Sequence, residues 1–508
     1  MASRAGAVAA VALLLVIAPI GAVAYRAGGI WLSAPDLAAL RFTLLQASLS
    51  AAISVVLAVP VARALARRRF FGRGLLITLM GAPFLLPVIV AVMGLLAVFG
   101  RSGLFNDMLA GLGIGRVSIY GLGGVLLAHV FLNLPLAVRM VLQGWQSIPA
   151  ERFRLAESLS FTPADIARHL ERPMLAGVLP GALATIFAIC LTSFAVALTL
   201  GGGPGATTLE LAIYQALRFE FDLGHAAGLA LVQTGLGGVS ALLAWRLARA
   251  TGFGAGMDRV LALRPPGGWR RAADAMVLVL AAAFLLLPLL ALAFRGLPGL
   301  WDLTPSVWVA AGRSVAVALV STGVTISAAL VLALAVARGE GRRWLELAAV
   351  LPLAASGLVL GTGLFLLVLP VIAPHRVALP VTVVVNALMA LPFAFRLILP
   401  EARALEAGYG RLSASLGLRG PARLRYLVLP RLARPLGFSA GLAAALSMGD
   451  LGVIALFADR GGATLPLMVQ HLTAAYRTDA AAGAALLLVG LSLGIFWAFD
   501  AGGRRAAA

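Results

Sequence analysis

The sequence contains no lysine, and this absence excludes two kinds of chemistry. All 40 basic residues are arginines. A P-loop needs a lysine to reach the phosphates of a nucleotide, and Schiff-base catalysis needs a lysine amine. We therefore expect this chain to be no enzyme and to carry no ATPase site, so that any ATP hydrolysis would take place on another protein.

Cysteine and charge are also scarce. The single cysteine, Cys190, excludes an internal disulfide, and the five histidines show no metal-ligand spacing, so we expect no metal site. Only 12% of the residues are charged and 61% are hydrophobic, which excludes an ordinary soluble enzyme. The formal charge of +20 does not indicate a nucleic-acid partner, because the arginines lie in short stretches between apolar runs.

Long apolar runs recur along the whole chain and predict an all-α membrane protein with about twelve transmembrane helices. A bilayer core about 30 Å thick is crossed by roughly 20 apolar residues in a helix. We expect crossings at 6–25, 43–62, 75–99, 121–143, 176–200, 226–245, 274–294, 314–336, 346–370, 378–399, 435–457 and 480–499.

The distribution of arginine predicts the orientation of these crossings. Most of the arginines fall on one side if the N-terminus is inside, and cytoplasmic loops carry an excess of basic residues. We therefore expect both termini in the cytoplasm. The stretch Ala22-Val23-Ala24 resembles a signal-peptidase site, but an even number of crossings favours a first helix that is retained.

The two halves of the chain repeat each other. A shift of 257 residues aligns Leu134-Pro135 with Leu391-Pro392, Arg154-Leu155 with Arg411-Leu412, and Gly205-Ala206-Thr207 with Gly462-Ala463-Thr464. We predict two homologous six-helix halves, 1–250 and 273–508, joined by a cytoplasmic linker at 251–272. With six crossings each, the halves share one orientation, and a pathway between them is expected, as in transporters with parallel repeats.

Each half contains one long inside loop, 144–175 in the first and 400–434 in the second. We predict that each loop forms a short helix, a turn, and a second short helix ending at Pro173 or Pro430. A glycine such as Gly417 supplies a left-handed turn, and the following proline starts a new helix. Exposed leucines can fill a partner's groove, and two copies with equal spacing favour docking over the alternative of a topology signal on anionic lipid.

These loops resemble the EAA loops of ATP-binding-cassette importer permeases, whose pattern is Glu-Ala-Ala, three residues, Gly, and a later Pro. The sequence departs from that pattern, because the Glu position holds Arg154 and Arg411 and the first Gly is Ser160. In that family the loop is a coupling helix seated in a cleft of the ATPase subunit. The resemblance implies ATPase contacts by Arg154, Leu155, Ala156, Leu159, Ser160, Phe161, Arg411, Leu412, Ser413, Leu416, Gly417 and Leu418.

The resemblance also implies a fold and partners. We expect the type I importer permease fold, in the bacterial inner membrane, with two copies of an ATPase subunit and a periplasmic substrate-binding protein. ATP and magnesium would be bound by the ATPase, and this chain would hold no cofactor.

The fusion of two halves, with the stretches 200–215 and 448–453, most resembles permeases for thiamine and thiamine pyrophosphate. The resemblance implies import of thiamine and its phosphates. Fused iron(III) permeases share this architecture and are the alternative. An ion-coupled secondary transporter is less favoured, because such proteins usually carry coupling acids within their helices and only Asp450 is a candidate here.

Five residues are candidates for the substrate pathway. Asp450 interrupts an apolar run, and an acid at a helix centre costs about 2.5–3.5 kcal/mol on insertion scales, so we expect it to face a cavity or a partner. A carboxylate could favour the thiazolium cation, but Asp450 could instead cap a helix. Ser193 is its counterpart in the repeat. Glu210, Tyr214 and Gln215 are expected at the mouth of the pathway or, alternatively, on the polar face of an interfacial helix.

Overall fold

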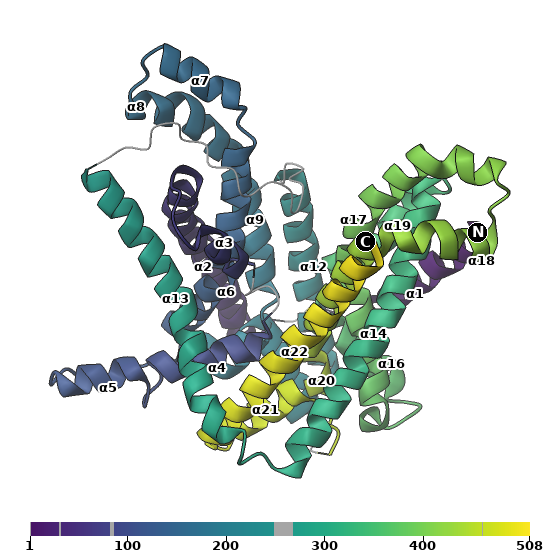
Figure 1. Cartoon of the computed structure of the whole chain (residues 1–508). Helices are drawn as coiled ribbons and strands as arrows, with labels where there is room; N and C mark the ends of the chain where they lie inside the picture. Colours follow the sequence, from purple (N-terminus) through teal and green to yellow (C-terminus); the bar gives the residue numbers. More distant parts are fainter. Residues whose placement is uncertain (1, 30–31, 82–85, 248–267, 460, 508) are drawn as a thin grey trace.

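The computed structural model describes all residues except 1, 30–31, 82–85, 248–267, 460 and 508 (Figure 1). In the described residues the chain is built of helices and contains no strand. Within that described part, eleven helices are long and apolar enough to cross a membrane, or up to twelve if one bent pair counts as a span. The predicted all-α membrane architecture is confirmed.

In the described residues, ten long helices make up all or most of ten predicted crossings. They are α1 (Ala2–Ala27), α2 (Ala34–Arg67), α6 (Leu122–Gln146), α9 (Arg172–Leu191), α12 (Leu223–Leu247), α13 (Trp269–Gly299), α14 (Pro305–Ala337), α17 (Ala378–Ser415), α19 (Leu429–Met448) and α22 (Thr478–Ala507). Of the linker predicted at 251–272, residues up to 267 lie outside the described part of the chain, and Trp269 already begins α13.

The crossings predicted at 75–99 and 346–370 are not straight helices. The first divides into α3 (Arg73–Leu79) and α4 (Val88–Phe99), and the second into α15 (Arg342–Val350) and α16 (Gly357–Val368), whose axes differ by 95°. Prolines account for the breaks, because Pro87 immediately precedes α4 and Pro352 lies in the 3₁₀ turn after α15. Hydropathy detects the length of such a segment but not its bend.

The crossings predicted at 176–200 and 435–457 are interrupted near one end. A break at 192–194 separates α9 from α10 (Ala195–Leu200), and a break at 449–451 separates α19 from α20 (Gly452–Phe457). The remaining α-helices are short: α5 (Leu104–Gly111), α7 (Ala150–Ser158), α8 (Pro163–Ile166), α11 (Leu209–Gln215), α18 (Gly420–Arg423) and α21 (Leu465–Ala474).

The same three-helix packing occurs twice. In the first copy α2 packs against α6 and α9, and in the second α14 packs against α17 and α19. A matching hydrogen bond accompanies each copy. The Leu209 N–H donates to Thr43 Oγ1 at 2.9 Å, and the Leu465 N–H donates to Ser314 Oγ at 2.8 Å. The packing and these hydrogen bonds are thus alike in the two parts of the chain.

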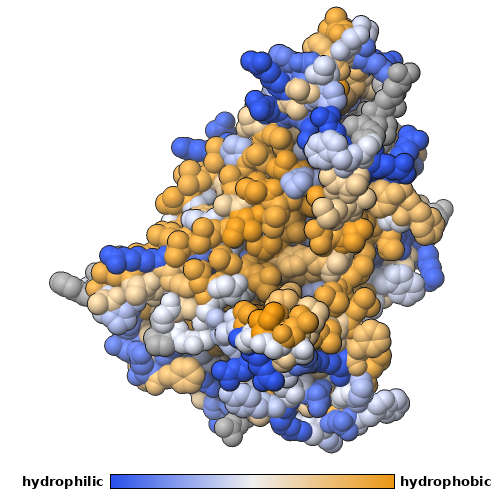
Figure 2. All heavy atoms as spheres, turned by 90° about the vertical axis from the view of Figure 1, so that its left-hand side faces the viewer, coloured by the Kyte–Doolittle hydropathy of each residue, from blue (hydrophilic) through white to orange (hydrophobic). Residues whose placement is uncertain are grey.

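The two copies interlock through their first helices. The α1 helix packs against α16 and α12, and α13 packs against α4 and α22. One large cluster of buried apolar side chains accordingly combines residues of α1, α4 and α12 with residues of α16, α20 and α22. The face shown in Figure 2 carries a broad apolar band with hydrophilic atoms at both ends, as expected for a protein surrounded by lipid.

Candidate functional site

The two predicted docking loops lie at the same end of the molecule (Figure 1). The first consists of α7, a turn and α8. In the second, α17 continues without interruption to Ser415, and α18 follows the turn. The first helix of the second loop is therefore the end of a long membrane helix and not the separate short helix we predicted. Both chain termini lie toward this end as well.

The two turns have the same hydrogen-bonded geometry. In the first, the Phe161 N–H donates to the Ala156 carbonyl at 2.9 Å and the Ser160 N–H donates to Glu157 at 3.0 Å. In the second, the equivalent bonds from Leu418 to Ser413 and from Gly417 to Ala414 measure 3.0 and 3.1 Å. Both are Schellman motifs, which close a helix through one left-handed residue.

The left-handed position is Ser160 in one turn and Gly417 in the other, with φ of 55° and 65°. The left-handed turn predicted at Gly417 is confirmed, and the first loop forms the same turn at Ser160, where no glycine predicted it. Ser160 adopts this conformation at a cost of about 1–2 kcal/mol that a glycine avoids. The surrounding hydrogen bonds therefore hold a conformation that the sequence of the first loop does not favour.

Most of the predicted docking side chains are exposed. Leu155 and Leu416 are 59% and 64% exposed. Arg154, Leu159, Ser160, Arg411, Leu412 and Gly417 are also exposed, and Phe161 and Leu418 are half-buried. Ala156 and Ser413 are buried and occupy the same position in their motifs, so they stabilise the turns from inside rather than facing a partner.

Pro173 and Pro430 do not end the second loop helices, contrary to our prediction. Each is the second residue of a membrane helix, α9 or α19, and a π-helical turn precedes it at Ala167–Glu171 or Leu424–Val428. A wider turn accommodates a proline, which has no N–H for the regular ladder. The helices consequently run on from the loops, as Pro163–Leu191 and Gly420–Phe457.

Ion pairs connect each loop to a neighbouring membrane helix. Glu171, in the first π turn, pairs with Arg63 at 2.8 Å and also with Arg67, both on α2. Glu406 on α17 pairs with Arg338, which caps the C-terminal end of α14, at 2.9 Å and with Arg423 of the second loop at 2.7 Å. We did not single out these carboxylates from the sequence, where they are ordinary members of an arginine-rich loop.

Ser193 lies in the break between α9 and α10 and belongs to a buried polar chain. Its Oγ is 2.8 Å from His129 Nε2, and His129 Nδ1 is 3.2 Å from Ser50 Oγ. This series of hydrogen bonds links α2, α6 and the break between α9 and α10. His129 was not among our candidates, although the repeat offered a signal, because a shift of 257 residues pairs it with Asn386.

The second copy has a similar series of hydrogen-bonded polar side chains, but it does not reach the break at 449–451. Ser447 Oγ accepts hydrogen bonds from Asn386 Nδ2 and Ser321 Oγ, each at 2.9 Å. Asp450, in the break itself, accepts a bond from the Val453 N–H at 3.4 Å through Oδ1 and so caps α20. Its Oδ2 is buried without a hydrogen-bond partner. Asp450 thus fits the alternative of a helix cap, and its second carboxylate oxygen, Oδ2, makes no hydrogen bond.

The two breaks approach each other at the centre of the molecule. A Cβ built on Gly452, beside the second break, would lie 3.6 Å from a ring carbon of Phe194, in the first break. The Phe194 ring also packs edge-on against Tyr214 of α11, with ring centroids 5.2 Å apart. Tyr214 therefore lies at the same junction as Ser193 and the second break.

The other two candidates on α11 differ in exposure. Glu210 is 1% exposed and accepts a hydrogen bond from Gln233 Nε2 at 3.1 Å. It faces the protein interior rather than an open mouth. Gln215 is half-buried at the end of α11.

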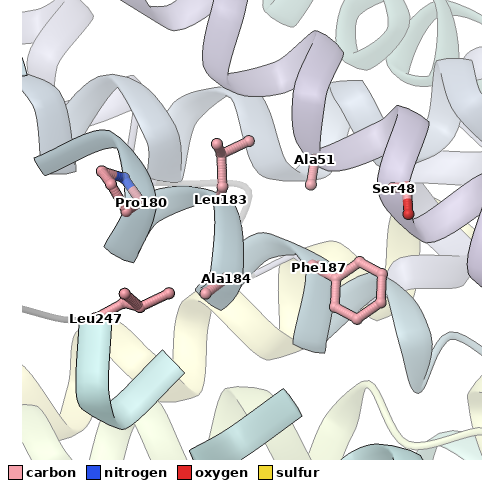
Figure 3. Close-up of a pocket in the computed structure, with 7 residues that line it drawn as sticks. All are labelled: Ser48, Ala51, Pro180, Leu183, Ala184, Phe187 and Leu247. Carbon is pink, nitrogen blue, oxygen red and sulfur yellow. The ribbon is translucent and has the colours of Figure 1, made fainter. Parts of the chain in front are cut away.

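A hollow of about 390 Å³ lies apart from this junction, between α2, α9 and the end of α12 (Figure 3). It is lined almost entirely by apolar side chains, among them Leu183, Phe187 and Leu247. It contains none of the predicted pathway residues. Within the described part of the chain, no three His, Cys, Asp or Glu side chains are grouped so as to hold a metal ion.

The chain is similar to transport permeases along most of its length. It is 39% identical over 499 residues to the thiamine transport system permease protein ThiP of Salmonella typhimurium, covering 92% of this chain and 91% of the relative. ThiP of Escherichia coli is also 39% identical, over 475 residues covering 90% and 87%. The molybdenum transport system permease protein ModB of Azotobacter vinelandii is 31% identical over 186 residues, 36% of this chain and 80% of the relative.

No family model matches the sequence. The relatives nevertheless suffice, because both thiamine permeases are 39% identical to this chain over about nine-tenths of its length. This protein belongs to the family of thiamine transport system permease proteins.

Proposed function

We propose that the chain is the membrane subunit of an ATP-driven importer that carries thiamine and its phosphates across the bacterial inner membrane. The observation that carries this proposal is the 39% identity to thiamine permeases over about nine-tenths of both chains. The paired loops add structural support, because a secondary transporter has no need for two exposed loops of equal geometry.

The paired loops would dock two copies of a separate ATPase subunit, one on each loop. The support is their equivalence: both are closed by the same Schellman motif and both present exposed leucines. ATP and magnesium would be bound by that subunit, and this chain would hold no cofactor. A periplasmic substrate-binding protein would deliver the substrate at the opposite end.

The loops and both termini would lie in the cytoplasm. Two observations support this orientation: the arginine-rich segments include both loops, and the termini lie toward the same end of the molecule as the loops.

Movement of the loops would reach the breaks through rigid helices. The helical segments 163–191 and 420–448 join each loop to a break, which contains Ser193 in one copy and Asp450 in the other. When the ATPases close on ATP, displacement of the loops would swing α9 and α19 and open the junction of the two breaks to the other side. Glu171 and Glu406 would make α2, α14 and α17 follow that movement.

Asp450 is the group in this junction best suited to a cationic substrate. The thiazolium ring of thiamine carries a permanent positive charge, and Asp450 Oδ2 is a buried acceptor without a protein partner. A carboxylate in a water-poor site attracts a cation more strongly than it does in water. Ser193 and Tyr214 would contribute neutral contacts on the side of the first copy.

The test is uptake of labelled thiamine by cells with and without this gene, with ferric iron as comparator. We expect thiamine uptake to be lost on deletion and restored by the intact gene. Loss of iron uptake instead would refute the substrate. Uptake by ATP-loaded vesicles after collapse of the ion gradients separates an ATP-driven importer from a secondary transporter, which would stop.

A further inference from the structure

One segment of the first copy has no counterpart in the second. Residues 100–121 join α4 to α6 and include the helix α5, whereas residues 369–377 suffice to join α16 to α17. The α5 helix projects sideways from the bundle (Figure 1). Neither the paired loops nor the junction of the breaks requires this excursion.

The excursion is held in place by a buried asparagine. Asn106 is fully buried, and its Nδ2 donates to the carbonyl oxygens of Gly100 at 2.8 Å and Val117 at 2.9 Å. Its Oδ1 accepts from the Val117 N–H at 2.8 Å. The Phe105 ring also packs against Phe99 at the end of α4, with centroids 5.7 Å apart. These contacts make α5 a defined element rather than a loose loop.

The outer face of α5 is apolar and uncovered. Leu104, Met108 and Leu112 follow one another at four-residue spacing and are 52%, 58% and 67% exposed, and Phe105 lies beside them. Asp107 lies off this stripe and is also exposed. Apolar side chains of this size, grouped on one side of a helix, indicate an interaction surface rather than a solvated one.

We propose that α5 lies in the headgroup region of the bilayer, in the leaflet opposite the paired loops, with its apolar stripe facing the acyl chains. Its occupant is thus phospholipid. The direction of α5 supports this choice, since it projects sideways, away from the rest of the bundle, where a binding protein seated over the pathway would not meet it (Figure 1).

The surroundings of α5 also match a headgroup region. In Figure 2, where α5 points toward the viewer, the apolar band ends at its level and hydrophilic atoms lie beyond. Trp301 and Tyr476 are 91% and 90% exposed at the same end of the molecule, as aromatic side chains are at a membrane interface. Exposed Arg101 and Arg116 precede and follow the helix and would reach lipid phosphates.

The test is depth measurement with a nitroxide label at Met108→Cys, with Asp107→Cys as the matched control, since Asp107 is exposed on the same helix but lies off the apolar stripe. The native Cys190 is buried, and the labelled parent measures its background. The purified full chain is reconstituted in vesicles of phosphatidylethanolamine and phosphatidylglycerol. Collision of the label with oxygen, which dissolves in lipid, is compared with collision with a water-soluble nickel chelate present on both sides.

We expect the label at position 108 to collide mainly with oxygen and the label at position 107 mainly with the chelate. Equal access of the chelate to both positions would overturn the proposal. Shielding of position 108 only after addition of a purified periplasmic binding protein would also overturn it, in favour of protein docking. Leu112→Cys repeats the measurement on the same stripe, in case the first variant does not fold. This outcome is independent of which substrate is carried.

Discussion

Gly94 of α4 lies against the backbone of Pro288 of α13, where a Cβ on the glycine would come within 2.8 Å of the proline carbonyl oxygen. The contact between Gly363 of α16 and Pro19 of α1 is its equivalent and is closer still. The two glycines, Gly94 and Gly363, are 269 residues apart in the sequence, and the two prolines, Pro19 and Pro288, are separated by the same number. In each case the first helix of one copy is docked on the broken helix of the other, and only glycine leaves room for it.

We predict that Gly94→Ala separates α4 from α13 and destabilises the protein by about 1–3 kcal/mol, the usual cost of overpacking. The measurement is the thermal unfolding midpoint of the purified protein in detergent. Gly490→Ala on α22 is the control, because a Cβ there meets no atom within 4 Å. Equal midpoints for the two variants would contradict the close packing of these helices.

We predict that Gly417→Val uncouples ATP hydrolysis from uptake while the protein still inserts. A β-branched residue at φ of 65° is strained, so the second loop would lose its Schellman turn. The measurement is thiamine uptake together with the ATPase rate of the assembled transporter. Gly408→Val in the preceding helix is the control, because that position is exposed and open. Coupled uptake by the Gly417 variant would show that the turn is not needed.

We predict that Ser160→Gly is tolerated and stabilises the first loop by about 1 kcal/mol, since it relieves the left-handed strain at Ser160. Coupling would then require the left-handed backbone at position 160 but not the serine hydroxyl. Unfolding midpoints and coupled uptake of this variant are the measurements. A loss of uptake without a loss of stability would instead assign the Ser160 hydroxyl to the ATPase contact.

We predict that Glu406→Gln impairs uptake, because it removes the negative charge that forms ion pairs with both Arg338 and Arg423. The loss of a partly buried charged hydrogen bond should cost about 1–3 kcal/mol. Glu346→Gln, whose ion pair with Arg403 is more exposed, should cost under about 1 kcal/mol. Uptake at saturating thiamine, with the amount of inserted protein measured in parallel, distinguishes the two. Similar effects would argue against a transmitting role for Glu406.

We predict that Asp450→Asn lowers thiamine uptake several-fold while the protein remains as stable as the parent. Asparagine caps a helix about as well as aspartate, so the bond to the Val453 N–H is kept and only the charge is lost. The measurements are the unfolding midpoint and the concentration dependence of uptake. Unchanged uptake would leave Asp450 with a capping role alone.

The helical architecture could be predicted from the sequence because lipid imposes it locally. Each crossing needs its own apolar length, and the backbone must satisfy its hydrogen bonds within the helix. The turn at Gly417 was predictable for a similar reason, since a glycine followed by a proline is a local signal. At Ser160 there is no such glycine, and only the spacing shared with the second loop indicated a turn.

What only the tertiary structure decided depends on contacts between distant segments. Hydropathy cannot distinguish a straight helix from one bent at Pro352, and a proline such as Pro173 stops a helix only if no π turn accommodates it. The placement of His129 against Ser193, and of Glu406 between two arginines, depends on which helices pack together. The sequence by itself determined the crossings and the paired loops, because these are properties of short segments. Packing decided how the loops are joined to the breaks and which polar groups meet there.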